Sequence, residues 1–309
     1  MLKPEIAAYL EMGAQSGLPA VWEVPISTFR KNGENRPAQS GTPEPINTLI
    51  HRYIPGPSAE LPIRIYRPHP TATLPVLVWF HGGGWATSHL DVYEQAMRSL
   101  SNKGEFAVIA VNYQKSPEHK FPIPFDDCYA TLLWIRDNAE NLHIDPLQIG
   151  VGGDSAGGNL AAAVALKVRD TGDLALAFQF LVYPCNDPEM TYDSASRNAT
   201  GFGLTTRAMK YFWDLYAAKK SDFSNPYFAP VLAKSFAGLA PAIVLTAEYD
   251  TLLDDGVNYS ELLKRDGTQV IYREYPGQMH GFFALAAITP DAEQAQEFAA
   301  CEINALLGR

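Results

Sequence analysis

The sequence predicts an α/β protein with a mostly parallel central sheet flanked by helices on both faces. Short continuous apolar runs, typical of strands that are buried on both faces, alternate along the chain with segments of helical spacing. Glycines cluster directly after two of these runs, at residues 82–84 and 152–158. The 309 residues are 47% hydrophobic and 19% charged, an ordinary globular composition that suits one large domain with an insertion.

Each element is predicted by a local pattern. Residues 1–20 have amphipathic helical spacing, whereas residues 31–60 are rich in Gly, Pro, Asn and Ser and predict a loop or flap. Alternating or β-branched apolar residues predict strands at 63–66, 74–80, 107–112, 149–152, 177–183, 242–246 and 270–275. Apolar residues repeated at helical intervals predict helices at 91–102, 126–138, 159–169, 255–266 and 291–307.

The alternation is interrupted at residues 186–235, where helix and loop signals occur without a clear core strand. Aromatic residues are dense there: residues 202–228 contain eight, where the chain average of 11% gives about three. We interpret this interval as a small helical insertion with its own hydrophobic core. Part of the same surface is also a candidate wall of an apolar pocket, and the two interpretations are compatible.

Charge and cysteine content exclude several classes of protein. The net charge of −10 argues against nucleic acid or a stable membrane association, because both partners require basic patches. Cys128, Cys185 and Cys301 form no CxxC pair, which excludes a zinc knuckle or a dense disulfide framework. The first residues lack the apolar run of a secretory signal. We therefore expect a soluble, cytoplasmic protein, and the sequence leaves its oligomeric state open, a dimer included.

The segment 153–157, Gly-Asp-Ser-Ala-Gly, fits the G-x-S-x-G pattern of a nucleophilic serine on a sharp strand-to-helix turn. Ser155 lies between a predicted strand and a predicted helix, as this pattern requires. The helix N-terminus directs free N–H groups toward a site where negative charge develops. The same glycines match a dinucleotide fingerprint poorly, because Ser155 occupies the place of its third glycine, and no lysine follows to make a P-loop.

A second glycine cluster follows the strand at 74–80, in the sequence His81-Gly-Gly-Gly-Trp85. Three consecutive glycines are costly in backbone entropy, and a loop that turns its N–H groups into a cavity explains them. Such donors stabilise the oxyanion that forms during acyl transfer. We predict that Gly83, Gly84 and Ala156 donate these N–H groups, and that His81 orients the loop.

Together these motifs resemble the hormone-sensitive-lipase family (bacterial family IV) of serine carboxylesterases, within the α/β-hydrolase fold. The resemblance extends over about residues 60–309 and rests on residues 81–85, 153–158, Asp250 in Glu-Tyr-Asp-Thr-Leu, and His280 in His-Gly-Phe. The family segment Tyr-Arg-Leu-Ala-Pro-Glu-His reads Tyr-Gln-Lys-Ser-Pro-Glu-His here, at residues 113–119. The resemblance implies a helical cap, with residues 1–45 and 186–235 as its parts and residues 46–185 and 236–309 as the catalytic core.

A serine hydroxyl needs a base to attack an ester at neutral pH. In this fold the order along the chain is serine, acid, histidine, and only His280 follows Ser155. For the acid we favour Asp250, which comes soonest after the strand at 242–246. Asp254 and Asp255 lie near a helix start, where capping explains them.

These residues predict a serine esterase that acts on small uncharged esters with no metal or cofactor, and the resemblance implies acyl groups of short to medium chain length. An amidase or peptidase uses the same triad, and the family also resembles the plant gibberellin receptors, which lack the catalytic histidine; His280 argues against a receptor. Trp85, Tyr183, Phe202 and Phe282 are candidate pocket walls because each neighbours a motif or the cap, although ordinary core packing explains them equally well. Residues 1–45 are a candidate flap over the site.

Overall fold

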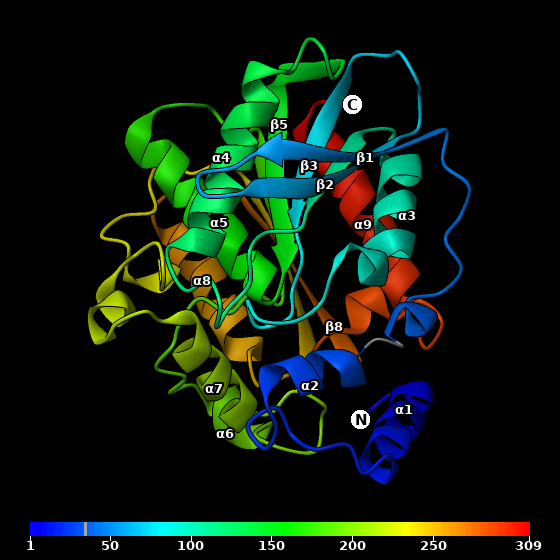
Figure 1. The fold of residues 1–309 in the computed structure, drawn as a ribbon, viewed down its shortest axis with the longest axis vertical. Coiled ribbons are helices and arrows are strands. Elements are labelled where there is room, and N and C mark those ends of the chain that lie inside the picture. Colours follow the sequence, from blue (N-terminus) through cyan, green and yellow to red (C-terminus); the bar gives the residue numbers. More distant parts are fainter. Residues whose placement is uncertain (34–35) are drawn as a thin grey trace.

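A computed structural model of the chain describes residues 1–33 and 36–309 and contains one eight-stranded sheet (Figure 1). The strand order is β1-β2-β4-β3-β5-β6-β7-β8. Strands β3 to β8 run parallel to one another, whereas β1 pairs antiparallel with β2, and β2 antiparallel with β4. The predicted mostly parallel sheet is thereby confirmed. The strand bounds are β1 Thr48–Pro55, β2 Glu60–Arg67, β3 Leu74–Phe80, β4 Ala107–Val111, β5 Ile144–Asp154, β6 Phe178–Val182, β7 Ala242–Tyr249 and β8 Val270–Met279.

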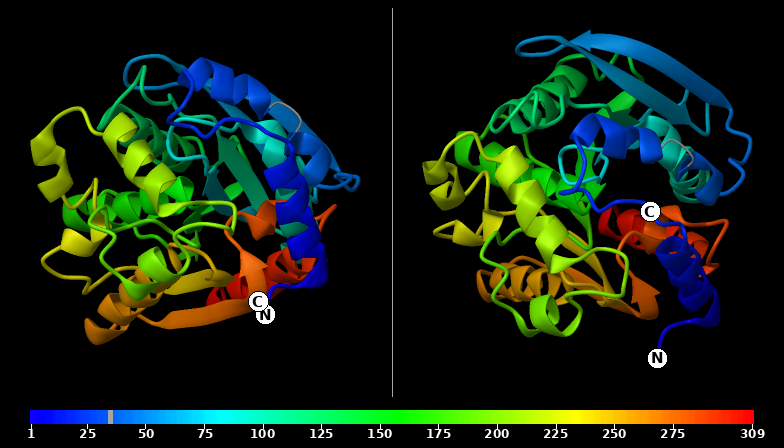
Figure 2. Two further views of the ribbon diagram at one scale, coloured as in Figure 1. Left: turned by 90° about the horizontal axis from the view of Figure 1, so that it is seen from below. Right: turned by 60° about the horizontal axis from the view of Figure 1, so that its bottom comes forward.

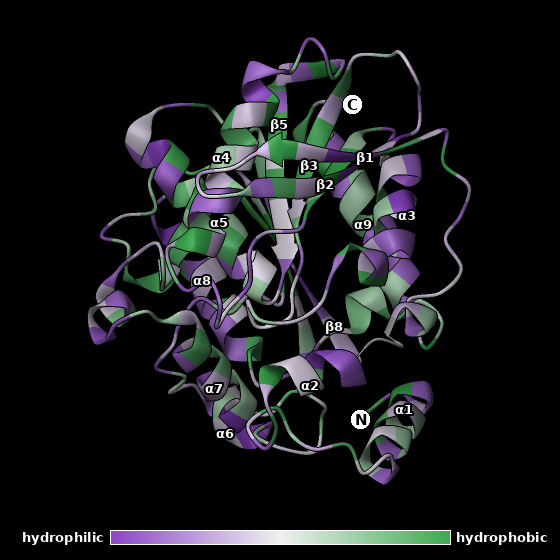
Figure 3. Ribbon diagram, in the orientation of Figure 1, coloured by the Kyte–Doolittle hydropathy of each residue, from purple (hydrophilic) through white to green (hydrophobic). Residues whose placement is uncertain are grey.

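Helices cover both faces of this sheet because its strands bury apolar side chains on both sides. Val76 and Val78 of β3 belong to a core with helices α4, α5 and α8, whereas the alternate residue Leu77 packs in a second core with α3 and α9. In Figure 3 the hydrophilic colour gathers on outer elements such as α3. The helix bounds are α1 Pro4–Gln15, α2 Ile26–Asn32, α3 Glu94–Gly104, α4 Ile123–Asp137, α5 Ala156–Thr171, α6 Asp193–Arg197, α7 Thr206–Tyr216, α8 Leu253–Arg265 and α9 Asp291–Leu306.

Four helices outside the core layers, α1, α2, α6 and α7, gather at one end of the molecule (Figure 1), and the view from below in Figure 2 looks onto this end. Residues 186–235, all of which the structure describes, form α6, α7 and two short 3₁₀ helices. Four of their aromatic rings pack together: Trp213, Tyr216 and Phe223 contact Phe228, the first two at 5.0 Å between ring centroids. These rings do not form a core of their own, because they pack in the hydrophobic cluster that also contains side chains of β3 and α5. The prediction of a separate core for the insertion was therefore wrong.

Two elements differ from the sequence prediction. Strand β1 and helix α2 fall within or beside the interval that was expected to be loop or flap, residues 31–60. Most residues of β1 are exposed, so the strand leaves no alternating hydrophobic pattern. It is held in the sheet by its backbone pairing with β2 along its whole length.

A helix needs about 20 apolar residues to span a bilayer. Within residues 1–33 and 36–309, every helix is too short or too polar to do so.

Candidate active site

Ser155 occupies the turn between β5 and α5 with a φ of +55°. Its N–H donates to the carbonyl oxygen of Val182, which fixes the turn against the neighbouring strand. The flanking glycines are sterically required. A β-carbon at Gly157 would lie 1.9 Å from the carbonyl oxygen of Phe80, and one at Gly153 would lie 2.3 Å from the carbonyl oxygen of Gly157. The motif therefore forms the strained serine turn that the sequence predicts.

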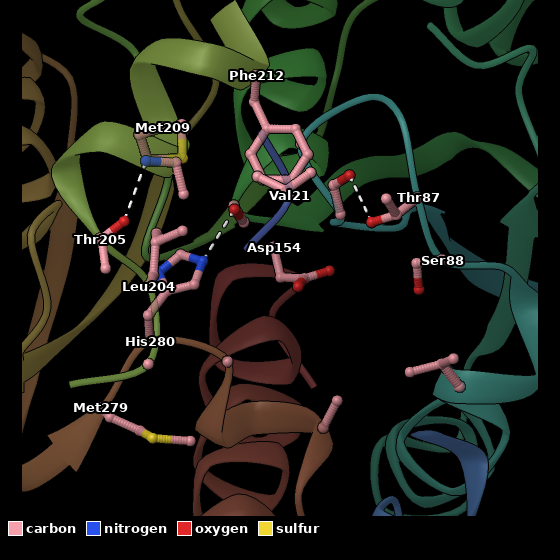
Figure 4. Close-up of a pocket in the computed structure, with 18 of the residues that line it drawn as sticks. Val21, Thr87, Ser88, Asp154, Leu204, Thr205, Met209, Phe212, Met279 and His280 are labelled. Atoms are coloured by element: carbon pink, nitrogen blue, oxygen red, sulfur yellow. Dashed lines mark hydrogen bonds between the residues drawn. The ribbon is translucent and has the colours of Figure 1, made fainter. Parts of the chain in front are cut away.

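The structure brings together the three residues that the sequence selects as a triad (Figure 4 labels His280 and draws a dashed hydrogen bond from its ring). His280 follows β8, and its Nε2 lies 2.9 Å from Ser155 Oγ, while its Nδ1 lies 2.7 Å from Asp250 Oδ2. The side chain of Asp250 is fully buried and that of His280 is 12% exposed. Because a carboxylate accepts, Nδ1–H donates to Asp250, and Nε2 is left to accept the serine proton.

The loop carrying Asp250 is fixed by its own hydrogen bonds. Asp250 Oδ1 accepts the N–H of Leu252 at 2.9 Å, and the carbonyl oxygen of Asp250 accepts from the side chain of Asn198 at 2.9 Å. The two neighbouring acids, Asp254 and Asp255, accept hydrogen bonds from the insertion instead. Asp254 accepts the N–H of Ser194, and Asp255 accepts two N–H groups of residues 186–187, so both hold the insertion onto the core. The geometry thus separates Asp250 from its neighbours.

The glycine loop turns its backbone toward the serine. Gly83 and Gly84 have φ values of +114° and +60°, a region that favours glycine. The carbonyl oxygen of Gly83 accepts the N–H groups of Ala86 and Thr87, which closes the loop into a tight turn. Among the described residues, no hydrogen-bond acceptor is found for the N–H groups of Gly83, Gly84 and Ala156. Gly83 and Gly84 line the same cavity as Ser155, and Ala156 directly follows Ser155, so the arrangement can receive an oxyanion.

Asp154 fastens this loop to the serine turn. Its Oδ1 accepts the N–H of Gly82 at 2.8 Å, and its Oδ2 accepts the hydroxyl of Tyr93 at 2.9 Å. Burial raises the pKa of Asp154 to about 6. The position of Asp154 in the sequence could have indicated this role, because a buried carboxylate directly before the serine needs hydrogen-bond partners.

His81 has the supporting position that was predicted for it. Its Nδ1–H donates to the carbonyl oxygen of Gly82, and its ring stacks on Tyr113 at a centroid distance of 4.5 Å. The hydroxyl of Tyr113 in turn donates to the carbonyl oxygen of His81 at 2.6 Å. Burial lowers the pKa of His81 to about 3, so the imidazole is neutral at physiological pH.

The triad opens into a cavity of about 410 Å³ (Figure 4). Apolar side chains from the N-terminal segment, the insertion and the loop around His280 form most of its walls: Val21, Trp22, Phe29, Leu204, Met209, Phe212, Met279 and Leu285. Polar groups are fewer and include Thr87 and Ser88. A concave apolar site with a few convergent polar groups suits a small organic ligand.

None of the four pocket residues proposed from the sequence lies in this wall. Trp85 stacks on Tyr216 behind the glycine loop at 4.4 Å, and Phe282 is fully buried beside Tyr275. Phe202 contacts Tyr249 instead of the cavity. Tyr183 lies against the His280 ring at 4.6 Å and so supports the base from behind. The expectation for these walls was wrong because nearness to a motif in the sequence does not fix the direction of a side chain in a loop.

Cys128 and Cys185 are buried and Cys301 is exposed, and all three are free thiols. In the described part of the chain, residues 1–33 and 36–309, no three His, Cys, Asp or Glu side chains are grouped to hold a metal ion.

Comparison with known proteins identifies the family. The chain matches the α/β hydrolase fold family over residues 77–284. Among relatives, the carboxylesterase NlhH of Mycobacterium tuberculosis is 36% identical over 76% of this chain and 75% of its own length. The arylesterase of Saccharolobus solfataricus is 33% identical over 91% of this chain and 92% of its own. The carboxylic ester hydrolase LipN of Mycobacterium tuberculosis is 37% identical over 75% of this chain, but the match spans only 63% of LipN.

A solved ester hydrolase from the metagenome of Lake Arreo superimposes with a TM-score of 0.96 at 36% identity, over the whole of both chains. The chain therefore belongs to the α/β-hydrolase family, of the hormone-sensitive-lipase type that its motifs resemble. Within that family it is a carboxylesterase, as the sequence predicted.

Proposed function

We propose that the chain hydrolyses short- to medium-chain carboxylic esters through an acyl-enzyme on Ser155, with His280 as base and Asp250 as acid. One observation carries the proposal: Ser155, His280 and Asp250 form a continuous hydrogen-bonded chain that opens into an apolar cavity. A nucleophile, a base and a group that orients the base, each within hydrogen-bond reach of the next, define nucleophilic acyl transfer.

The proposed steps follow from these positions. Ser155 Oγ attacks the ester carbonyl while its proton moves to His280 Nε2, and Asp250 stabilises the imidazolium without taking the proton. The developing oxyanion accepts from the N–H groups of Gly83, Gly84 and Ala156. His280 then protonates the leaving alcohol. A water molecule, deprotonated by His280, then attacks the carbonyl of the acyl-enzyme. The bond from the acyl carbon to Ser155 Oγ breaks, Oγ takes the proton back from His280, and the acid is released.

The size and chemistry of the cavity support the substrate class. Its volume of about 410 Å³ lies near the lower end of the range of small-molecule sites, and its walls are mostly apolar. We therefore infer a small, uncharged ester as substrate, with acyl chains below about ten carbons preferred.

The test is steady-state hydrolysis of p-nitrophenyl esters, from acetate to dodecanoate, by the wild-type protein and by Ser155→Ala. A matched control is Ser99→Ala, because Ser99 is a buried serine of α3 outside the cavity. We expect turnover of the short esters by wild type and by Ser99→Ala, and none above background by Ser155→Ala. An active Ser155→Ala would refute the nucleophile, and efficient turnover of emulsified long-chain triglyceride would refute the chain-length preference.

A further inference from the structure

Arg30 links the N-terminal segment to the loop that carries the candidate oxyanion donors. It lies on α2, and its Nε donates to the carbonyl oxygen of Ala86 at 2.7 Å. Its Nη2 donates to the carbonyl oxygen of Ser116, also at 2.7 Å. Both terminal nitrogens bind the carboxylate of Glu118 at 2.8 Å. The guanidinium thus joins three positions of the core, and its side chain is 29% exposed.

These three positions belong to one structural unit. Ala86 donates its N–H to the carbonyl oxygen of Gly83 and so closes the turn that presents the N–H groups of Gly83 and Gly84. Ser116 donates its N–H to the carbonyl oxygen of Trp85, inside the same turn. Arg30 therefore holds the far side of the glycine loop while Asp154 holds its near side through Gly82.

Arg30 also stands next to the cavity. The preceding residue, Phe29, lines the cavity together with Val21 and Trp22 of the same N-terminal segment. A second cation attaches the N-terminal segment to the insertion. The guanidinium of Arg207, on α7, lies over the ring of Trp22 at 4.4 Å from the ring centroid. The segment therefore has one cationic contact with the glycine loop and another with the insertion.

We propose that Arg30 is a positioning residue for the oxyanion loop, which it holds in register through Ala86 and Ser116. This role rests on the proposed function of Gly83 and Gly84 as oxyanion donors. The planar guanidinium binds two carbonyl oxygens and a carboxylate at once, which a lysine ammonium cannot reproduce. A loop that shifts by a fraction of an ångström keeps its fold but presents its donors poorly to the transition state.

The test compares Arg30→Ala and Arg30→Lys with the matched control Arg207→Ala, which removes the cationic contact between the same segment and α7 without touching the glycine loop. Two measurements are made on each variant. The first gives kcat and KM with p-nitrophenyl butyrate, and the second gives the inhibition constant of an alkyl trifluoromethyl ketone, whose adduct with the serine bears an oxyanion. Substrate affinity is measured separately in the Ser155→Ala background.

We expect Arg30→Ala to lower kcat and weaken the ketone by the same factor, about tenfold or more. Substrate affinity in the Ser155→Ala background should change less than about threefold, since only the transition state needs the donors. Arg30→Lys should be intermediate, and added guanidinium should restore part of the activity of Arg30→Ala. Arg207→Ala should leave the relation between kcat and the inhibition constant of the ketone as it is in the wild-type protein.

An Arg30→Ala variant with wild-type kcat and ketone affinity would overturn the proposal, as would a loss of kcat with unchanged ketone affinity. If Arg30→Ala does not fold, the same two measurements on Arg30→Lys decide. A wild-type protein that hydrolyses no ester and binds no ketone would instead refute the proposed function itself, and the role of Arg30 with it.

Discussion

Replacing Gly84 by alanine tests whether the glycine loop supplies the oxyanion donors. Gly84 has a φ of +60°, and a β-carbon there would lie 2.4 Å from two ring carbons of Phe212. Ordinary carbon–carbon contact requires about 3.5–4.0 Å, so the ring and the loop must separate by about 1 Å or more. The left-handed backbone adds about 1–2 kcal/mol for a residue with a β-carbon.

The loop is expected to move more than the ring, because Phe212 belongs to helix α7 and is 7% exposed, packed against the core. The N–H of Gly84 then leaves the position that an oxyanion requires. Losing one such donor costs about 10²–10³ in kcat in a measured protease, and we expect a loss of at least about 100-fold here.

A second variant separates the steric cause from the backbone cause. Phe212→Ala removes the ring, so the double variant Gly84→Ala/Phe212→Ala retains only the left-handed strain. In the Phe212→Ala background, Gly84→Ala should lower kcat at least about tenfold less than it does in the wild-type protein. This difference corresponds to a coupling free energy of about 1.4 kcal/mol or more between the two positions. The assay is hydrolysis of p-nitrophenyl butyrate, with thermal unfolding of each variant as the control. A Gly84→Ala variant with wild-type kcat, or a cycle without coupling, would refute the reasoning.

Three further outcomes are expected. Asp250→Asn should lower kcat by about 10⁴-fold because the His280 tautomer is lost, whereas Asp254→Asn, which keeps its acceptor oxygen, should remain active in the same ester assay; equal losses would contradict the choice of acid. The raised pKa of Asp154 means that the folded state retains a proton which the unfolded chain releases, so the free energy of unfolding falls by about 3 kcal/mol as pH rises from about 4 to 6. Urea titrations should show this slope in wild type and lose it in Asp154→Asn; an unchanged slope would argue against a raised pKa. Deleting residues 1–15 should change chain-length preference and lower the midpoint of thermal unfolding, since Tyr9 lines the cavity and Ile6 packs against Met279; unchanged kinetics would refute a role for this segment at the site.

The candidate triad could be predicted from the glycines of the serine turn and from the order in which the acid and the histidine follow the serine along the chain. The turn at Ser155 tolerates only glycine at positions 153 and 157, where a β-carbon would meet backbone oxygen or carbon atoms. His280 was selected by order alone, as the single histidine after Ser155. The structure places both at the carboxyl ends of parallel strands, where such an α/β sheet positions a site.

The cavity walls could not be found in the same way, because they come from segments that are distant in sequence. Residues 20–29, 83–93, 203–212 and 279–285 each contribute, and only the second and fourth adjoin a motif. Nearness in sequence selected Trp85 and Phe282, whose rings face the core behind their loops. A wall residue is defined by the direction of its side chain, and in irregular loops the sequence has no period from which to infer that direction.

In helix α7 the helical periodicity distinguishes the residues that line the cavity from those that pack in the core. Ala208, Met209 and Phe212 line the cavity, whereas Trp213 and Tyr216 pack with Phe228. Residues three or four positions apart lie on the same face of a helix. Met209 and Phe212 therefore share the face of α7 that lines the cavity, whereas Trp213 and Tyr216 share the face that packs against the core. Counting aromatics in the insertion predicted that they are buried together, but only their helical phase separates Phe212 from the adjacent Trp213. The ring that confines Gly84 therefore belongs to the insertion, and the shape of the acyl-transfer site depends on the insertion as well as on the core motifs.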